Sequence, residues 1–434
     1  MRVTTYNINQ VNCLTEIMFE EALEQAKWYD VYFKDNGKPY GPLHGLPISL
    51  KDSFDVKGVQ STIGYVSFLK HSPKTEDSVL VEILRDLGAV FYCKTNLPQS
   101  MMTIDSENHV FGRTLNPHKL SLTAGGSTGG EGALVAMHGS VLGMCTDIAG
   151  SARLPALCDG VYGFKPSAER LPFGRKTPPG RLGSPSPIVP VIGVQAHSIR
   201  DFEAFMRTVI DADPWIYDDG VISVPWRRVD PPSQLLRFGF ILEDPRRPMH
   251  PVALRAMTKA RESLQEAGHE IVEFHIGSGD ALSVPSIYDC ALLAWRFFLL
   301  DSTKTALRFI QAGDEEIIAS LKACSFAELK DWKPTLEELF DIIVERKKVM
   351  DIYRRLWIHS PDSGLASSCL DGIIVPTYQG TAQPHDMFGL PIYTVLANLL
   401  DVSISMNVTT IFITNVCLVS GHFNPLSQCQ QRVG

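Results

Sequence analysis

The sequence lacks any paired cysteine motif. Its nine cysteines stand at wide, irregular spacings, and no CxxC pair occurs among them. That absence excludes a zinc ribbon or a redox dithiol of the usual spacing. The segment from His269 to Glu273 (HEIVE) also fails the HExxH zinc pattern, because glutamate stands where the second histidine is needed. We therefore expect reduced thiols, no metal and no cofactor.

An excess of charge of one sign is also missing. The net charge of −8 is mild for a chain of 434 residues and is spread along it. The sequence therefore shows no basic region of the kind that binds nucleic acid. The first residues lack a basic region followed by a continuous apolar stretch, which excludes a typical secretory signal. We expect a cytoplasmic protein without a nucleic-acid partner.

No linker, charge block or repeat divides the chain, and 44% hydrophobic residues are enough to bury a large core. The sequence therefore predicts a single domain over residues 1–401. The segment 402–421 contains no charged residue, but Ser, Asn and Thr interrupt it too often for a membrane span of about 20 residues. We interpret residues 402–434 as an atypical tail, either a strand or a non-native reading such as a retained intron.

Hydrophobic periodicity predicts an α/β protein with helices on both faces of a central sheet. Residues 237–242, 251–267 and 269–274 form a predicted β-α-β unit, and residues 279–358 are mostly helical. The other predicted helices are 15–29, 79–87, 131–137, 199–212 and 393–400. The other predicted strands are the apolar segment that ends at Lys51, then 90–94, 141–145 and 372–376.

Four glycines surround Ser127, in the segment Gly125–Gly130 (GGSTGG). Glycine allows a close backbone approach that a side chain would block, and the helix that follows offers free N–H groups. A phosphate-binding loop is the first alternative, but the segment lacks the Gly-Lys-Ser/Thr ending of a P-loop. A G-x-S-x-G nucleophile elbow is the second, but turn-like residues stand where the elbow needs a strand.

Ser151 follows the predicted strand 141–145 in the segment TDIAGSAR, residues 146–153. Small residues before a serine allow consecutive backbone N–H groups to converge on one point, as an oxyanion hole requires. A serine N-cap on a short helix is the structural alternative, and taken alone it would be favoured.

Five segments resemble conserved blocks of the amidase signature family, in the right order. They are GPLHGLPISLKD (41–52), KTNLPQS (94–100), FGRTLNP (111–117), TAGGSTGGEGALVA (123–136) and TDIAGSARLPALCDGVYGFKPS (146–167). The resemblance covers residues 12–401 and is strongest to the acetamidase-like fungal branch. It implies a three-layer α/β/α fold with a central mixed sheet, shortened at both ends and incomplete at the C-terminus.

The resemblance implies a Ser-cisSer-Lys triad, with Ser151 as the nucleophile, Ser127 as the bridging serine after a cis peptide bond, and Lys51 as the base. A lysine accepts a proton only when it is neutral, so its pKa must fall about three units from a usual value of about 10.4. Burial lowers a lysine pKa that far. The apolar approach to Lys51, residues 46–50, is consistent with such burial.

The resemblance assigns the oxyanion hole to the backbone N–H groups of Ile148, Ala149, Gly150 and Ser151. Thr128 stands where many family members have a second serine, and it keeps the hydroxyl. Ala149 replaces a frequent glycine. Asp147 and Arg153 are interpreted as holding the loop by hydrogen bonds and ion pairing, and Lys165 as structural.

The expected reaction is hydrolysis of a carboxylic amide to an acid and ammonia or an amine, through a serine acyl-enzyme. The expected partner is a small-molecule amide, aliphatic or aromatic, and the expected oligomer is a homodimer. Three alternatives stay open: an esterase with the same triad, an inactive truncated product, and an amidotransferase subunit that acts on charged tRNA.

Overall fold

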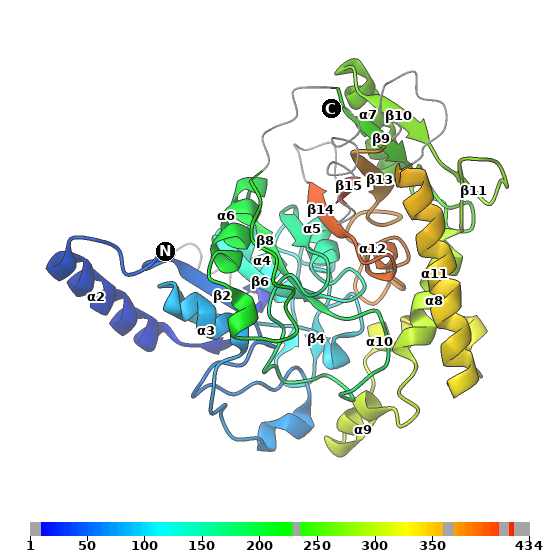
Figure 1. Cartoon of the computed structure of the whole chain (residues 1–434). Helices are drawn as coiled ribbons and strands as arrows, with labels where there is room; N and C mark the ends of the chain where they lie inside the picture. Colours follow the sequence, from blue (N-terminus) through cyan, green and yellow to red (C-terminus); the bar gives the residue numbers. More distant parts are fainter. Residues whose placement is uncertain (1–9, 229–234, 359–368, 408–415, 421–434) are drawn as a thin grey trace.

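A computed structural model describes residues 10–228, 235–358, 369–407 and 416–420 of the chain (Figure 1). An eleven-stranded sheet runs through the molecule, in the order β1-β3-β2-β6-β8-β7-β14-β15-β13-β9-β10. The strands of this sheet are β1 (Leu14–Ile17), β2 (Pro47–Lys51), β3 (Val90–Thr95), β6 (Leu142–Asp147), β7 (Tyr162–Lys165), β8 (Val191–Ala196), β9 (Arg237–Phe240), β10 (Glu270–Glu273), β13 (Gly372–Pro376), β14 (Ser403–Asn407) and β15 (Val416–Ser420).

The sheet is mixed, as predicted. Strand β2 runs parallel to β3 and β6, and β13, β9 and β10 are parallel to one another. The pairs β6–β8, β7–β8, β7–β14, β14–β15 and β13–β15 are antiparallel. Two short ribbons lie outside it, β4 (Glu107–Asn108) with β5 (Gly112–Arg113) and β11 (His275–Ile276) with β12 (Ser283–Val284).

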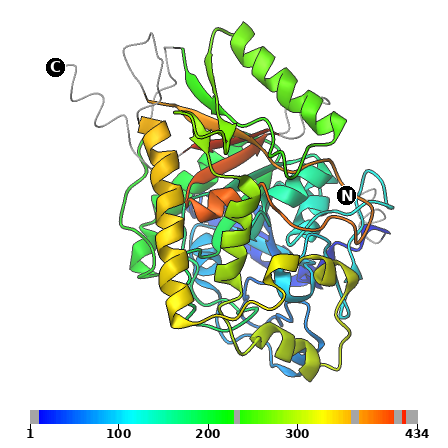
Figure 2. The same ribbon diagram turned by 90° about the vertical axis from the view of Figure 1, so that its right-hand side faces the viewer.

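Helices cover both faces of the sheet, which confirms the three-layer prediction (Figures 1 and 2). The α-helices are α2 (Phe19–Asn36), α3 (Val79–Asp86), α4 (Gly129–Ala136), α5 (Arg153–Asp159), α6 (Ile199–Ile210), α7 (Pro251–Glu266), α8 (Ile287–Phe298), α9 (Thr305–Ala312), α10 (Ala319–Ala323), α11 (Leu336–Ile358) and α12 (Val395–Leu399). Among the described helices, none is long and apolar enough to cross a membrane.

Side-chain alternation along β2 explains how the fold separates its core from its site. Ile48 and Leu50 point into the hydrophobic core that α3 and α6 form on one face. Ser49 and Lys51 point to the opposite face, where they contact residues of α4 and of the loop before it. Because successive side chains of a strand face opposite sides of the sheet, one strand supplies both the core and the candidate base.

The predicted helix at residues 15–29 is wrong at its start. Residues Leu14–Ile17 form β1, which pairs antiparallel with β3, so the sheet satisfies their backbone groups. Helix α2 begins at Phe19, runs beyond the predicted end to Asn36, and ends at Gly37 with a left-handed φ of 66°. In Figure 1 this helix projects away from the rest of the molecule.

Most of the other predicted elements are confirmed. The β9–α7–β10 unit has parallel strands, and β13 occupies the predicted residues. In the predicted tail, β14 pairs with β7, and Val402 and Ile404 are buried. The chain division at residue 401 stays a prediction, and most of residues 408–434 lie outside the described part.

Candidate active site

Lys51 stands at the end of β2 and is fully buried. Its Nζ donates hydrogen bonds to Ser127 Oγ at 2.8 Å, Thr128 Oγ1 at 2.9 Å and Thr146 Oγ1 at 3.0 Å. The structure therefore brings the predicted base and the predicted bridging serine into direct contact. Thr146 belongs to β6, the neighbouring strand, and sequence reasoning gave it no role.

Burial lowers the pKa of Lys51 from its usual value near 10.5 to about 7, and the nearby Cys145, Asp147 and Glu131 act in the opposite direction. The contacts to Nζ are three hydroxyl groups, which accept three hydrogen bonds from the ammonium form. A hydroxyl can also donate, so one of the three can donate to the lone pair of the neutral amine while the other two accept. A lysine with such a pKa exists in both its neutral and its charged form near neutral pH. It can therefore both accept and return a proton.

Ser127 lies immediately before α4, and the Gly126–Ser127 peptide bond is cis. The serine is 2% exposed. A side chain on Gly126 would place its Cβ 2.5 Å from Thr103 O, so only glycine fits this approach. Three of the glycines predicted to cradle Ser127 thus pack against backbone, and Gly129 packs against the Ser106 side chain. The residues before Ser127 form a loop instead of the strand that a nucleophile elbow needs.

Ser151 lies in the loop between β6 and α5. It is partly exposed, whereas Lys51 and Ser127 are buried, so it is the one of these three predicted catalytic residues that a substrate could reach. The N-cap of α5 is Ala152, without a side-chain cap, and the N-cap alternative for Ser151 is therefore wrong. Within the described residues no hydrogen bond involves the Ser151 hydroxyl.

Gly150 gives this loop its shape. Its φ is +131°, a region that side chains rarely adopt, and a Cβ there would collide with Thr394. The Gly150 N–H donates to Asp147 Oδ1 at 2.9 Å, and the Ala152 N–H donates to Asp147 Oδ2 at 3.0 Å. Asp147 therefore holds the loop on both sides of Ser151, as the sequence predicted.

Arg153 joins Asp147 in a fully buried ion pair, with Nη2 2.8 Å from Oδ1. The same guanidinium donates to Thr394 O and to Asn398 Oδ1, both at 2.7 Å, and Asn398 lies in α12. Although burial opposes it, Arg153 lowers the pKa of Asp147 to about 2. This network ties the Ser151 loop to a helix about 240 residues later in the chain, a connection that no local pattern revealed.

We expect Arg153→Met to reduce the free energy of unfolding by about 3–5 kcal/mol, because it leaves a buried carboxylate without its partner. Denaturant titration at pH 7 measures this loss. Arg354→Met is the matched control, since its ion pair with Asp351 at 3.5 Å is exposed, and it should cost less than about 1 kcal/mol. Equal losses in the two variants would contradict the role given to Arg153.

Glu131 is a buried residue that sequence reasoning missed. It lies in the first turn of α4, and Ser49 Oγ of β2 donates to its Oε2 at 2.6 Å. Burial raises the pKa of Glu131 to about 8, so this carboxyl is largely protonated at neutral pH. This hydrogen bond joins the strand that carries Lys51 to the helix that follows Ser127. It thereby helps to hold the Lys51 and Ser127 side chains within hydrogen-bonding distance of each other.

Lys165 is placed as the sequence predicted, in a structural position. Its Nζ donates to Pro166 O at 2.8 Å and to Val402 O at 3.1 Å, which joins β7 to the start of β14. Elsewhere, the described residues hold no group of three or more His, Cys, Asp or Glu side chains that could bind a metal ion.

The sequence of the chain is similar to those of known proteins. A family model described as Amidase matches residues 2–419. An amidase of Gibberella moniliformis is 39% identical over 392 residues, which cover 90% of this chain and 71% of the relative. An acetamidase of Aspergillus oryzae is 35% identical over 399 residues, with coverage of 90% and 70%.

The same comparison extends to solved structures. Fatty acid amide hydrolase matches with a TM-score of 0.86 at 27% identity, over 98% of this chain and 78% of that chain. A bacterial aryl acylamidase described as an amidase signature enzyme matches with a TM-score of 0.76, over 99% of this chain and 90% of that chain. At 19% identity, the second match shows the fold alone.

Proposed function

The chain belongs to the amidase family and is a hydrolase that acts on amide carbon–nitrogen bonds, and from this premise we propose that Lys51, Ser127 and Ser151 carry out the hydrolysis. The family resemblance expected from the sequence is confirmed. Ser151 acts as the nucleophile, Ser127 as the proton bridge and Lys51 as the base. The observation that carries this assignment is the buried Lys51 Nζ, 2.8 Å from Ser127 Oγ.

In the first half of the reaction, Ser151 Oγ attacks the amide carbonyl carbon. Its proton passes to Ser127 Oγ, and the Ser127 proton passes to neutral Lys51 Nζ, which becomes an ammonium. The same path in reverse delivers a proton to the leaving nitrogen when the carbon–nitrogen bond breaks. Ammonia or an amine departs, and the acyl group remains as an ester on Ser151.

In the second half, water attacks the acyl-enzyme and gives its proton to Lys51 through Ser127. The ester bond then breaks, the proton returns to Ser151 Oγ, and the carboxylic acid is released. Both tetrahedral intermediates carry an oxyanion that backbone N–H groups stabilise. Because the Gly150 N–H is engaged by Asp147 Oδ1, we assign the oxyanion to the N–H groups of Ile148, Ala149 and Ser151 instead of the four expected from the sequence.

The proposed substrates are small aliphatic or aromatic carboxylic amides. Thr128, which stands in place of a second serine, supports the site through its hydrogen bond to Lys51 Nζ. An esterase with the same triad is the second candidate, because an acyl-enzyme forms equally from an ester. The cytoplasmic location and the homodimer stay predictions.

A matched pair of substrates distinguishes the two candidates. We expect 4-nitroacetanilide and 4-nitrophenyl acetate, which share an acetyl group, both to be hydrolysed, and acetamide to release ammonia. A fluorophosphonate probe should label the folded wild-type chain at Ser151, as peptide mass spectrometry can establish. Turnover of the ester alone would favour the esterase, and a cooperatively folded chain without label or turnover would favour the inactive product.

A further inference from the structure

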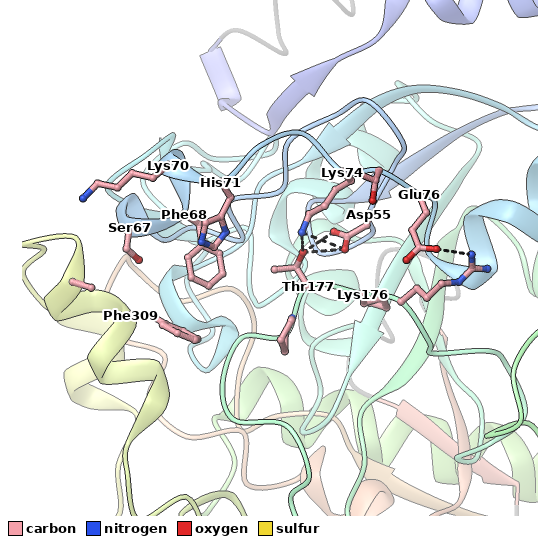
Figure 3. A pocket seen from close by; sticks show the side chains of 14 residues that line it. Asp55, Ser67, Phe68, Lys70, His71, Lys74, Glu76, Lys176, Thr177 and Phe309 are labelled. Atoms are coloured by element: carbon pink, nitrogen blue, oxygen red, sulfur yellow. Dashed lines mark hydrogen bonds and ion pairs between the residues drawn. The ribbon is translucent and has the colours of Figure 1, made fainter.

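A cavity of about 710 Å³ lies beside the loop that follows Lys51, and its size suits a small organic ligand (Figure 3). Asp55, four residues after Lys51, forms part of its wall. Among the described residues that line the cavity, none belongs to the triad or to the Ser151 loop. The proposed mechanism therefore leaves this cavity without a role.

The cavity carries an excess of positive charge. Lys70, Lys74 and Arg175 line it together with two carboxylates, Asp55 and Glu76, which gives +3 − 2 = +1 with histidine and the Lys176 amine neutral. The whole chain, by contrast, carries −8. A basic cavity in an acidic protein attracts anions selectively.

Both carboxylates in the wall already have partners. Asp55 Oδ2 lies 3.4 Å from Lys74 Nζ, and its Oδ1 accepts a hydrogen bond from Thr177 Oγ1 at 2.7 Å. Glu76 Oε2 lies 3.3 Å from Arg175 Nη1. Figure 3 shows these two paired groups side by side along one part of the wall.

Lys176 has no carboxylate within ion-pair distance among the described residues. Its Nζ lies 3.4 Å from the centroid of the Phe54 ring and 3.5 Å from Ser53 Oγ, so the residues directly after Lys51 hold it. Burial, followed by the charge of Lys51, lowers the pKa of Lys176 well below its usual value. An anion bound beside this amine would raise its pKa, so that the amine takes up a proton and pairs with the anion.

The other end of the cavity is apolar and aromatic. The Phe68 ring centroid lies 4.9 Å from that of Phe309 and 4.4 Å from that of His71. Pro178 and Ala312 extend the same wall. In Figure 3, Phe68 and Phe309 lie on one side of the cavity, apart from Lys74 and Thr177.

We propose that this cavity binds a small carboxylate with an apolar, aromatic-sized body, its carboxylate at Lys176 and its body against Phe68 and Phe309. The basic and the apolar ends together exclude a simple inorganic anion as the best fit, because such an anion would leave the aromatic end empty. The carboxylate belongs either to the amide substrate itself or to a free acid such as the one that amide hydrolysis releases. Only the identification of this source rests on the proposed function.

Calorimetric titration with 3-phenylpropionate tests the proposal, with the neutral 3-phenyl-1-propanol as the matched ligand. We expect the acid to bind the wild-type chain and the alcohol to bind at least about tenfold more weakly, since a charge-assisted contact is lost. Lys176→Met should weaken binding of the acid about tenfold or more, Lys176→Arg should restore it, and Lys348→Met, an exposed control on α11, should leave it unchanged. Equal binding of acid and alcohol, or equal binding by the wild type and a folded Lys176→Met, would overturn the proposal.

Binding is measured without turnover, so this test of the cavity is independent of the test of catalysis. Ser151→Ala should bind 3-phenylpropionate as the wild-type chain does. To identify the source of the carboxylate, the kinetics of hydrolysis of a neutral acyl amide are measured in the presence of 3-phenylpropionate. Competitive inhibition identifies the cavity as part of the substrate site. A change in kcat without a change in KM identifies a separate site for the free acid.

Discussion

Ser151→Ala is expected to lower kcat/KM for amide hydrolysis by about 10⁴-fold or more, because loss of a triad nucleophile removes nearly all covalent catalysis. The fold should be unaffected. Ser151 is partly exposed and no hydrogen bond of the described residues uses its hydroxyl, so removal of the hydroxyl leaves no buried group without a partner. Amide turnover and fluorophosphonate labelling should therefore disappear together, at an unchanged melting temperature.

Ser320→Ala is the matched control for this variant. Ser320 lies in α10, is 6% exposed, and its hydroxyl has no hydrogen-bond partner among the residues that the structure describes. The control should label and turn over as the wild type does. Labelling of Ser151→Ala at the wild-type rate would show that another residue is the nucleophile and would refute the proposed mechanism.

The sequence predicted the central elements of this fold because their patterns are local. Residues 372–376 are a short apolar run, and they form β13 as predicted. The wrong prediction of a helix at residues 15–17 has a non-local cause. Their spacing fits a helix, but pairing with β3, about 80 residues later in the chain, makes them a strand. Tertiary pairing overrides local propensity in such cases.

The residues of the candidate site also fall into two groups, those that a local sequence pattern predicts and those that only the tertiary structure brings together. Lys51, Ser127 and Ser151 lie in sequence blocks that resemble those of the family, and this resemblance alone predicts a role for each. Asn398 has no such pattern, because its importance arises only when α12 packs against the Ser151 loop and its amide reaches Arg153. The cavity at Lys176 is a further example, since its wall combines residues more than 200 positions apart.

Lys51→Met is expected to reduce kcat/KM by about 10⁴-fold or more, because Ser127 and Ser151 lose their proton acceptor. Stability should respond differently from activity. A pKa lowered from 10.5 to about 7 means that burial penalises the charged amine by roughly 4–5 kcal/mol, and methionine removes that penalty. Loss of the three hydrogen bonds from Nζ opposes this gain, so we expect the free energy of unfolding to change by less than about 2 kcal/mol.

The pH dependence of the wild-type enzyme gives an independent test of Lys51. The proposed mechanism requires the neutral amine, and the protonated form predominates below a pKa of about 7. We therefore expect kcat/KM to rise about tenfold per pH unit below pH 7 and to level off above it. The same group makes stability rise with pH between about 7 and 10.5, where the unfolded lysine still holds a proton that the folded one has lost. A profile that is flat from pH 5 to 8, or that falls as the pH rises through 7, would show that Lys51 does not act as the base.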